Sequence, residues 1–312
     1  DRKFYGNNYF ALGAMASAMA LRHPNDKRVV DIYGDHLLAG GDMEGALNHF
    51  KLHLKDEPPQ MDYYMAVIDI EDYRQHPDSV DRYVQLAVER FPDNPLLYIR
   101  KANRLYVKDN LMGAIETFHE AMQYATNDTL KGELWGYIGD TYHLIAERNQ
   151  SIKERKIKAD TLAYPVKMSP KKASKECYAA YEKSLSLHYE NASVLNNYAY
   201  YLSEEGKNLK KAYKMSRKTI EAEPNNATYL DTFGWILYLM GKPLEAKPHF
   251  KQAMLYGGKD SAVIMDHYAE VLYALKEYDL AMVYWNLAMH KNQDKVPGLE
   301  EKVNARKAAI KK

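Results

Sequence analysis

The chain has little of what disulfide-stabilised, membrane-spanning and nucleic-acid-binding proteins depend on. Cys177 is its single cysteine, which excludes an internal disulfide framework. No apolar run reaches the roughly 18 residues that a membrane-spanning helix needs. The formal net charge is +1, which gives no global electrostatic case for a nucleic-acid partner. The chain begins at Asp1, so we expect a fragment or a processed protein, and whether a signal peptide or lipid anchor preceded it stays open.

Motifs for catalysis, phosphate binding and metal binding are missing too. The sequence contains no GxxxxGK[ST], GxGxxG, CxxC or HExxH pattern. His49 and His53 have the four-residue spacing of metal ligands, but no nearby Cys or third His completes a site, so we expect them to pack. Cys177 takes a position between helices, where a buried thiol is inert. We therefore predict no catalytic, cofactor or metal site and no enzymatic activity.

What the sequence does have is a repeated proline. Pro24, Pro58 and Pro92 follow one another at a constant interval. A proline cannot continue the hydrogen-bond ladder of a helix and restricts the residue before it. Three prolines at one interval indicate a repeated helical unit.

The clearest copy of this unit runs from Asn226 to Gly258, NATYLDTFGWILYLMGKPLEAKPHFKQAMLYGG. It predicts two short helices joined by a turn. The small residues Gly234, Ala246 and Ala253 allow close approach of the two helices, and Phe250 fills the space between them. This pattern resembles the tetratricopeptide repeat (TPR), a helix–turn–helix unit of about 34 residues. The interval between the three prolines matches the length of that unit.

The resemblance covers nearly the whole chain and implies an all-α fold, a right-handed α-α superhelix of about seven repeats. A partial repeat over 1–26 precedes the first full repeat, and a capping helix over 297–312 follows the last. The predicted repeats cover residues 27–58, 61–92, 95–126, 132–189, 192–225, 227–258 and 262–293.

The fourth repeat carries an insertion over residues 147–172 that is rich in Lys and Arg. We expect it to lengthen both helices of the repeat around a loop at Tyr164, with Ser169 and Pro170 starting the second helix. Its basic surface suits an acidic partner, an anionic lipid surface or RNA, or is simply a solvated helical extension.

In the TPR family the first helix of each repeat lines a concave groove, and the resemblance implies which residues lie there. Several are acidic or aromatic, and we expect them on an exposed face, where substitutions usually cost within about half a kcal/mol. The lysine and arginine clamp for acidic C-termini is absent apart from Arg100 and Asn103. The groove therefore favours a peptide carrying Lys or Arg, although the acids could merely keep it soluble. The predicted contact residues are Tyr200, Asp231, Trp235, Tyr238, Asp266, Glu270 and Tyr273.

These features predict a non-catalytic scaffold that binds a protein or peptide in its groove. The alternative is an assembly module that associates with itself or with a larger complex through its ends and its basic insertion. The amino-acid sequence of the fifth and sixth repeats is similar to that of exported TPR proteins of Gram-negative anaerobes. That similarity implies a cell-envelope location, periplasmic or outer-membrane-associated, with a cytoplasmic one left open.

Overall fold

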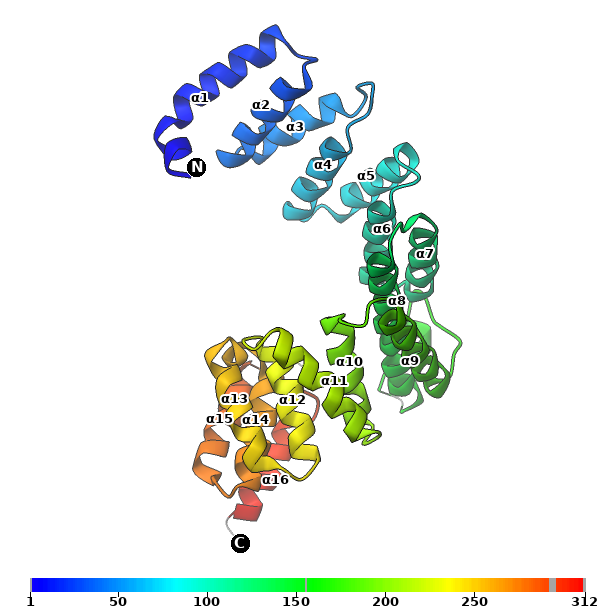
Figure 1. The fold of residues 1–312 in the computed structure, drawn as a ribbon, viewed down its shortest axis with the longest axis vertical. Helices are drawn as coiled ribbons and strands as arrows, with labels where there is room; N and C mark the ends of the chain where they lie inside the picture. The colour runs from blue at the N-terminus through cyan, green and yellow to red at the C-terminus, as the bar shows by residue number, and fades with distance from the viewer. Residues whose placement is uncertain (1, 155, 292–295, 311–312) are drawn as a thin grey trace. The chain divides into compact units, whose positions relative to one another are not determined.

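The described part of the chain is entirely helical. The computed structural model describes residues 2–154, 156–291 and 296–310, with side chains from residue 8 onward. Within these ranges it forms sixteen α-helices, two short 3₁₀ helices and no strand (Figure 1). The all-α class predicted from the sequence is confirmed.

Internal contacts divide the chain into two compact units. Unit 1 comprises residues 1–125 and 155–167, and unit 2 comprises residues 126–154 and 168–312. Unit 1 contains α1 (Arg2–Arg22), α2 (Lys27–Ala39), α3 (Met43–His53), α4 (Met61–Tyr73), α5 (Pro77–Arg90), α6 (Pro95–Val107), α7 (Leu111–Tyr124) and η1 (Ala159–Thr161). Unit 2 contains α8 (Asp128–Lys153), α9 (Pro170–Leu187), α10 (Ala192–Glu204), α11 (Leu209–Ala222), α12 (Ala227–Leu239), α13 (Pro243–Leu255), η2 (Gly258–Asp260), α14 (Ala262–Ala274), α15 (Tyr278–Lys291) and α16 (Leu299–Ile310).

Local sequence signals explain where these helices begin and end. In unit 1 a residue with positive φ recurs once per repeat, at Gly41, Gln75 and Asp109, and reverses the chain between the two helices of that repeat. Asn110 and Asn226 are N-caps whose side chains accept hydrogen bonds from backbone N–H groups of the first helical turn.

The fourth repeat is enlarged at its helices. α8 has 26 residues and α9 has 18, whereas α10 and α12 have 13 each, which agrees with the expected lengthening of both helices. Ser169 caps α9 through a hydrogen bond from the Lys172 N–H at 3.2 Å, and Pro170 is its first residue. The Asn149 amide donates to the Met168 carbonyl at 2.7 Å and ties the end of α8 to the chain entering α9.

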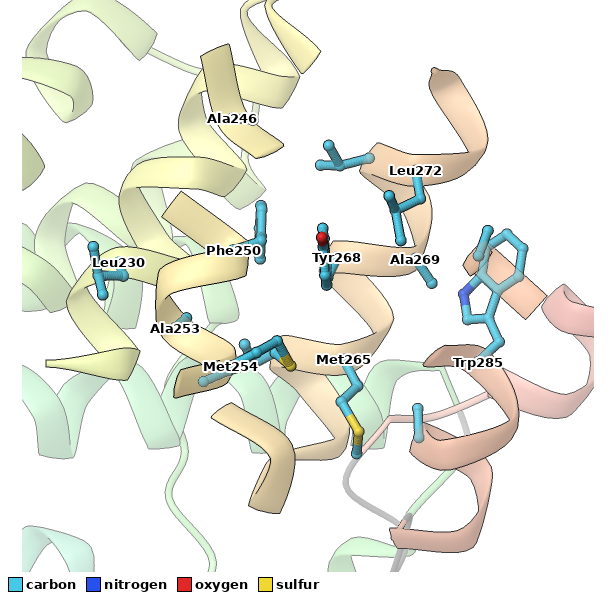
Figure 2. Packing of buried hydrophobic residues seen from close by; sticks show 14 of the residues in the cluster. Leu230, Ala246, Phe250, Ala253, Met254, Met265, Tyr268, Ala269, Leu272 and Trp285 are labelled. Carbon is cyan, nitrogen blue, oxygen red and sulfur yellow. The ribbon is translucent and has the colours of Figure 1, made fainter. Parts of the chain in front are cut away.

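The core of unit 2 is packed by the same small and large residues from which the repeat was predicted. Phe250 of α13 is fully buried and points toward Tyr268 of α14, with ring centroids 5.7 Å apart (Figure 2). Gly234 of α12 leaves the space that the Phe250 ring occupies: a Cβ at this glycine would lie 2.7 Å from Phe250 Cε2. Trp285 of α15 is the largest fully buried side chain.

Gly234→Val is therefore expected to destabilise unit 2 by about 1 to 3 kcal/mol, the usual cost of overpacking a filled core. Urea denaturation followed by far-UV circular dichroism measures the loss. Ala274→Val, on the exposed end of α14, serves as the control and should cost less than about 1 kcal/mol. An equal loss of stability for the two substitutions would show that the Phe250 ring can move aside for a side chain at residue 234.

Candidate functional site

The structure separates the seven predicted groove residues into buried acids and partly exposed aromatics. Asp231, Asp266 and Glu270 are each only 5% exposed. The expectation that these three carboxylates line an exposed groove is therefore wrong. A ligand outside the folded chain has little access to them.

The physical reason is that each carboxylate pairs with a basic side chain 36 residues later in the chain. His267 Nδ1 lies 2.9 Å from Asp231 Oδ1, between the first helices of the sixth and seventh repeats. At the same offset, Lys302 Nζ donates to Asp266 Oδ2 at 2.6 Å. A basic side chain of α14 thus pairs with an acid of α12, and a basic side chain of α16 pairs in the same way with an acid of α14.

The end of α14 shows the same arrangement. Arg306 of α16 donates to Glu270 Oε2 at 2.8 Å, and its guanidinium lies 4.6 Å from the centre of the Tyr273 ring. Trp285 Nε1 donates to Asp266 Oδ1 at 2.9 Å from the other side. Asp266, Glu270 and Tyr273 therefore hold α16 in place. The carboxylates of Asp266 and Glu270 neutralise the charges of Lys302 and Arg306.

The other predicted residues lie in a row of aromatic rings on the first helices of unit 2. Trp235 stacks on the His267 ring with centroids 4.0 Å apart and on Tyr238 with centroids 5.0 Å apart. The Tyr200 ring lies 6.3 Å from His267 and 5.9 Å from Tyr201. We call these five rings the aromatic row. Tyr200, Trp235 and Tyr238 are partly exposed, so part of the row is accessible to solvent.

A cavity of about 670 Å³ opens at the Tyr200 end of this row. It lies between the C-terminal half of α8, the N-terminal half of α9 and the end of α10, and we call it the hairpin pocket. It is lined by His143, Ala146, Glu147, Gln150, Pro170, Lys171, Ser174, Lys175, Tyr178, Tyr200, Tyr201, Glu204, Glu205 and Lys207.

Aromatic rings and carboxylates of the hairpin pocket already hold one another. The His143 ring stacks on Tyr201 with centroids 3.4 Å apart. The hydrogen bond from His143 lowers the pKa of the Glu147 carboxyl, since Nε2 lies 3.3 Å from Oε1. Glu204 accepts a hydrogen bond from Trp235 Nε1 at 2.8 Å, which connects the pocket to the aromatic row.

Two cations on one wall of the hairpin pocket remain available. Lys171 and Lys175 of α9 are exposed and make no ion pair within the described part of the chain. Lys207, by contrast, lies 3.0 Å from Glu205. The pocket thus offers aromatic surface beside two free ammonium groups.

Sequence reasoning identified Tyr200 but not the pocket around it. Glu147, Gln150, Pro170 and Lys171 belong to the insertion that the sequence located, so the signal was its length and its position. Which of its side chains face α10 depends on how α8 and α9 pack, and the sequence does not specify this.

The residues considered for metal binding and nucleophilic chemistry have structural partners. His49 Nε2 lies 2.8 Å from the Val30 carbonyl oxygen, and His53 Nδ1 lies 2.6 Å from Asp56 Oδ2. Burial raises the pKa of the Cys177 thiol, which disfavours the reactive thiolate. Among the described residues, no group of three or more His, Cys, Asp or Glu side chains could hold a metal ion, and no helix is long and apolar enough to cross a membrane.

Comparison with known proteins supports the fold. No family model and no curated protein matches the chain. Among solved structures, a tetratricopeptide repeat protein from Parabacteroides merdae is similar with a TM-score of 0.57 at 11% identity, over 89% of this chain and 97% of that one. The Cut9–Hcn1 hetero-tetramer of the APC/C contains a chain similar with a TM-score of 0.62 at 12% identity, over 96% of this chain.

The present chain spans only about half of that second structure, 52% of its length. At these identities the likeness concerns the fold alone. Together with the regular recurrence of the turns and the paired helices, it shows that this chain has the fold of a tetratricopeptide-repeat protein.

Proposed function

We propose that this protein is a non-catalytic scaffold and that unit 2 binds a peptide segment of a partner protein. The segment enters the hairpin pocket and continues along the aromatic row. The observation that carries this proposal is the open 670 Å³ cavity, whose size falls within the range of about 300 to 1,000 Å³ of ligand pockets. Aromatic and charged side chains line it together.

The lining favours a peptide with an aromatic or apolar side chain next to a carboxylate. The rings of Tyr178, Tyr200 and Tyr201 offer apolar surface, and tyrosine contributes contact area at low entropic cost. Lys171 and Lys175 can each bind a carboxylate without breaking an existing ion pair. The preference for a basic ligand rested in unit 2 on Asp231, Asp266 and Glu270, and their burial removes that part of its support.

Selection of peptides from a displayed random library, followed by calorimetry, tests this function. We expect peptides with the stated pattern and dissociation constants near the micromolar range, about −8 kcal/mol. Ser174→Trp places an indole in the pocket and is expected to weaken binding at least tenfold, about 1.4 kcal/mol.

Ser186→Trp adds the same side chain to an exposed position of α9 outside the pocket and should leave binding unchanged. Circular dichroism spectra of both variants check that α9 keeps its fold. Equal affinity of wild type and Ser174→Trp for every selected peptide would place the binding surface elsewhere.

We further propose a periplasmic or outer-membrane-associated location, which rests on the sequence similarity of the fifth and sixth repeats to exported proteins. Fractionation of the native cells, with immunodetection of the chain, tests it. Recovery in the cytosolic fraction would contradict the proposal.

A further inference from the structure

A second surface of unit 2 carries charge of one sign. α11 is the second helix of the fifth repeat and contains five basic residues but only one acidic residue, Glu221. All five basic side chains are exposed. They are Lys210, Lys211, Lys214, Arg217 and Lys218.

Two of these cations are already neutralised within the chain. Lys211 pairs with Glu182 and lies 4.4 Å from the centre of the Tyr198 ring. Arg217 Nε donates to Glu221 Oε1 at 2.8 Å. Both therefore contribute less to the attraction of a partner than their charge suggests.

The other three form a row without ion pairs in the described structure. Lys210, Lys214 and Lys218 are four residues apart, so they follow one side of α11 at steps of about 6 Å. We call them the lysine row. Three like charges this close repel one another, and an anionic partner relieves that repulsion.

A surface cavity of about 600 Å³ lies beside the lysine row and has an apolar floor. Tyr213 and Met240 line it together with the row and with the paired Arg217 and Glu221, and lysine stems are themselves aliphatic. The Tyr213 ring packs on Phe233 with centroids 5.2 Å apart, so the floor is anchored to the core. The surface thus combines a basic edge with room for an apolar side chain.

We propose that this surface docks an acidic helical segment of a partner protein. Carboxylates one helical turn apart on that segment match the spacing of the lysine row. One apolar side chain of the segment enters the cavity over Tyr213 and Met240. This surface lies on a second helix and shares no residue with the hairpin pocket, so it does not depend on the proposed function.

The cavity is the reason to prefer a protein segment to an anionic membrane. A lipid headgroup layer gains from the three lysines but has no protruding side chain for the space beside them. Three unpaired lysines alone give only weak attachment to a membrane surface.

Fluorescence anisotropy with a synthetic peptide tests the proposal. The probe is a labelled helical peptide with glutamates one turn apart and a single phenylalanine beside them, and its counterpart carries glutamines instead. Wild type should bind the glutamate peptide, more weakly at high salt, and not the glutamine peptide. The triple variant Lys210→Glu, Lys214→Glu, Lys218→Glu should lose about tenfold to a hundredfold in affinity.

The matched control changes net charge equally at exposed lysines outside α11: Lys259→Glu, Lys276→Glu, Lys307→Glu. It should bind like wild type, as should Ser174→Trp, since neither touches the surface. A triple Lys→Gln variant of the lysine row repeats the test without charge reversal. Met240→Ala should weaken the phenylalanine peptide severalfold and leave an alanine version of it unaffected.

Equal binding by wild type and both triple variants of the lysine row would overturn the proposal. So would binding of wild type to vesicles containing phosphatidylglycerol but not to the glutamate peptide, because a membrane would then be the partner.

Discussion

Asp266→Leu is expected to lower the free energy of unfolding of unit 2 by about 3 to 5 kcal/mol. In the folded protein the buried carboxylate accepts hydrogen bonds from Trp285 Nε1 and Lys302 Nζ. Leucine leaves the indole N–H buried without its acceptor, which costs about 1 to 3 kcal/mol on its own. It also removes the nearer of the two carboxylates beside the Lys302 ammonium, which keeps only Glu270 at 3.5 Å. Urea denaturation followed by tryptophan fluorescence measures the sum.

The control is Asp279→Leu, an exposed acid in the first turn of α15. Its loss should stay within about 1 kcal/mol, the value of a favourable charge at a helix N-terminus. An equally small effect of Asp266→Leu would mean that this carboxylate is solvated, as the groove hypothesis assumed. In that case it would regain its place among the candidate ligand contacts.

The repeat itself could be predicted because its signals are local. Turn residues, helix-terminating prolines and the alternation of Gly234 with Phe250 are properties of short stretches. Each has a direct steric consequence, so the all-α fold and the enlarged fourth repeat follow from reading the chain in order. The lengthening of α8 and α9 could be anticipated because the insertion over residues 147–172 falls between the two helices of one repeat.

The groove residues could be predicted only in part because their burial depends on a helix further along the chain. Position along a first helix shows that Asp266 and Glu270 lie on its groove side, but not that α16 covers them. The sequence predicted a capping helix over residues 297–312, where α16 lies. Its basic residues Lys302 and Arg306 were not connected to the acids of α14.

Several acids of the first helices thus connect one repeat to the next. Asp231 and Asp266 each pair with a basic side chain two helices later, and in unit 1 the Asp69 carboxylate pairs with Arg100, also two helices later, at 2.8 Å, although both of those side chains are exposed. An acidic pattern along these helices is therefore evidence of stacking between repeats before it is evidence of a basic ligand. Binding capacity is better inferred from the partly exposed rings and the hairpin pocket.

The Asp231–His267 pair makes the stability of unit 2 depend on pH in a direction that can be derived. Burial by itself lowers the pKa of His267, but the carboxylates of Asp231, Asp266 and Glu204 raise it above the ordinary value of about 6.5. The folded protein therefore holds a proton that the unfolded chain releases. The stabilisation is fully present below about pH 6.5 and is lost as the pH rises through the folded-state pKa.

We expect wild type to lose stability across this window relative to His267→Gln, with a slope approaching about 1.4 kcal/mol per pH unit for one proton. Glutamine can still donate to Asp231 but does not titrate. Burial lowers the pKa of His49 and His249, which gives the opposite sign, and both residues are common to the two proteins, so they cancel in the comparison. Because Trp235 stacks on His267, its fluorescence should report the same titration, with Trp235→Phe as the blank. Parallel stability profiles for wild type and His267→Gln would show that the imidazole stays neutral beside Asp231, and the pair would then be a plain hydrogen bond between two repeats.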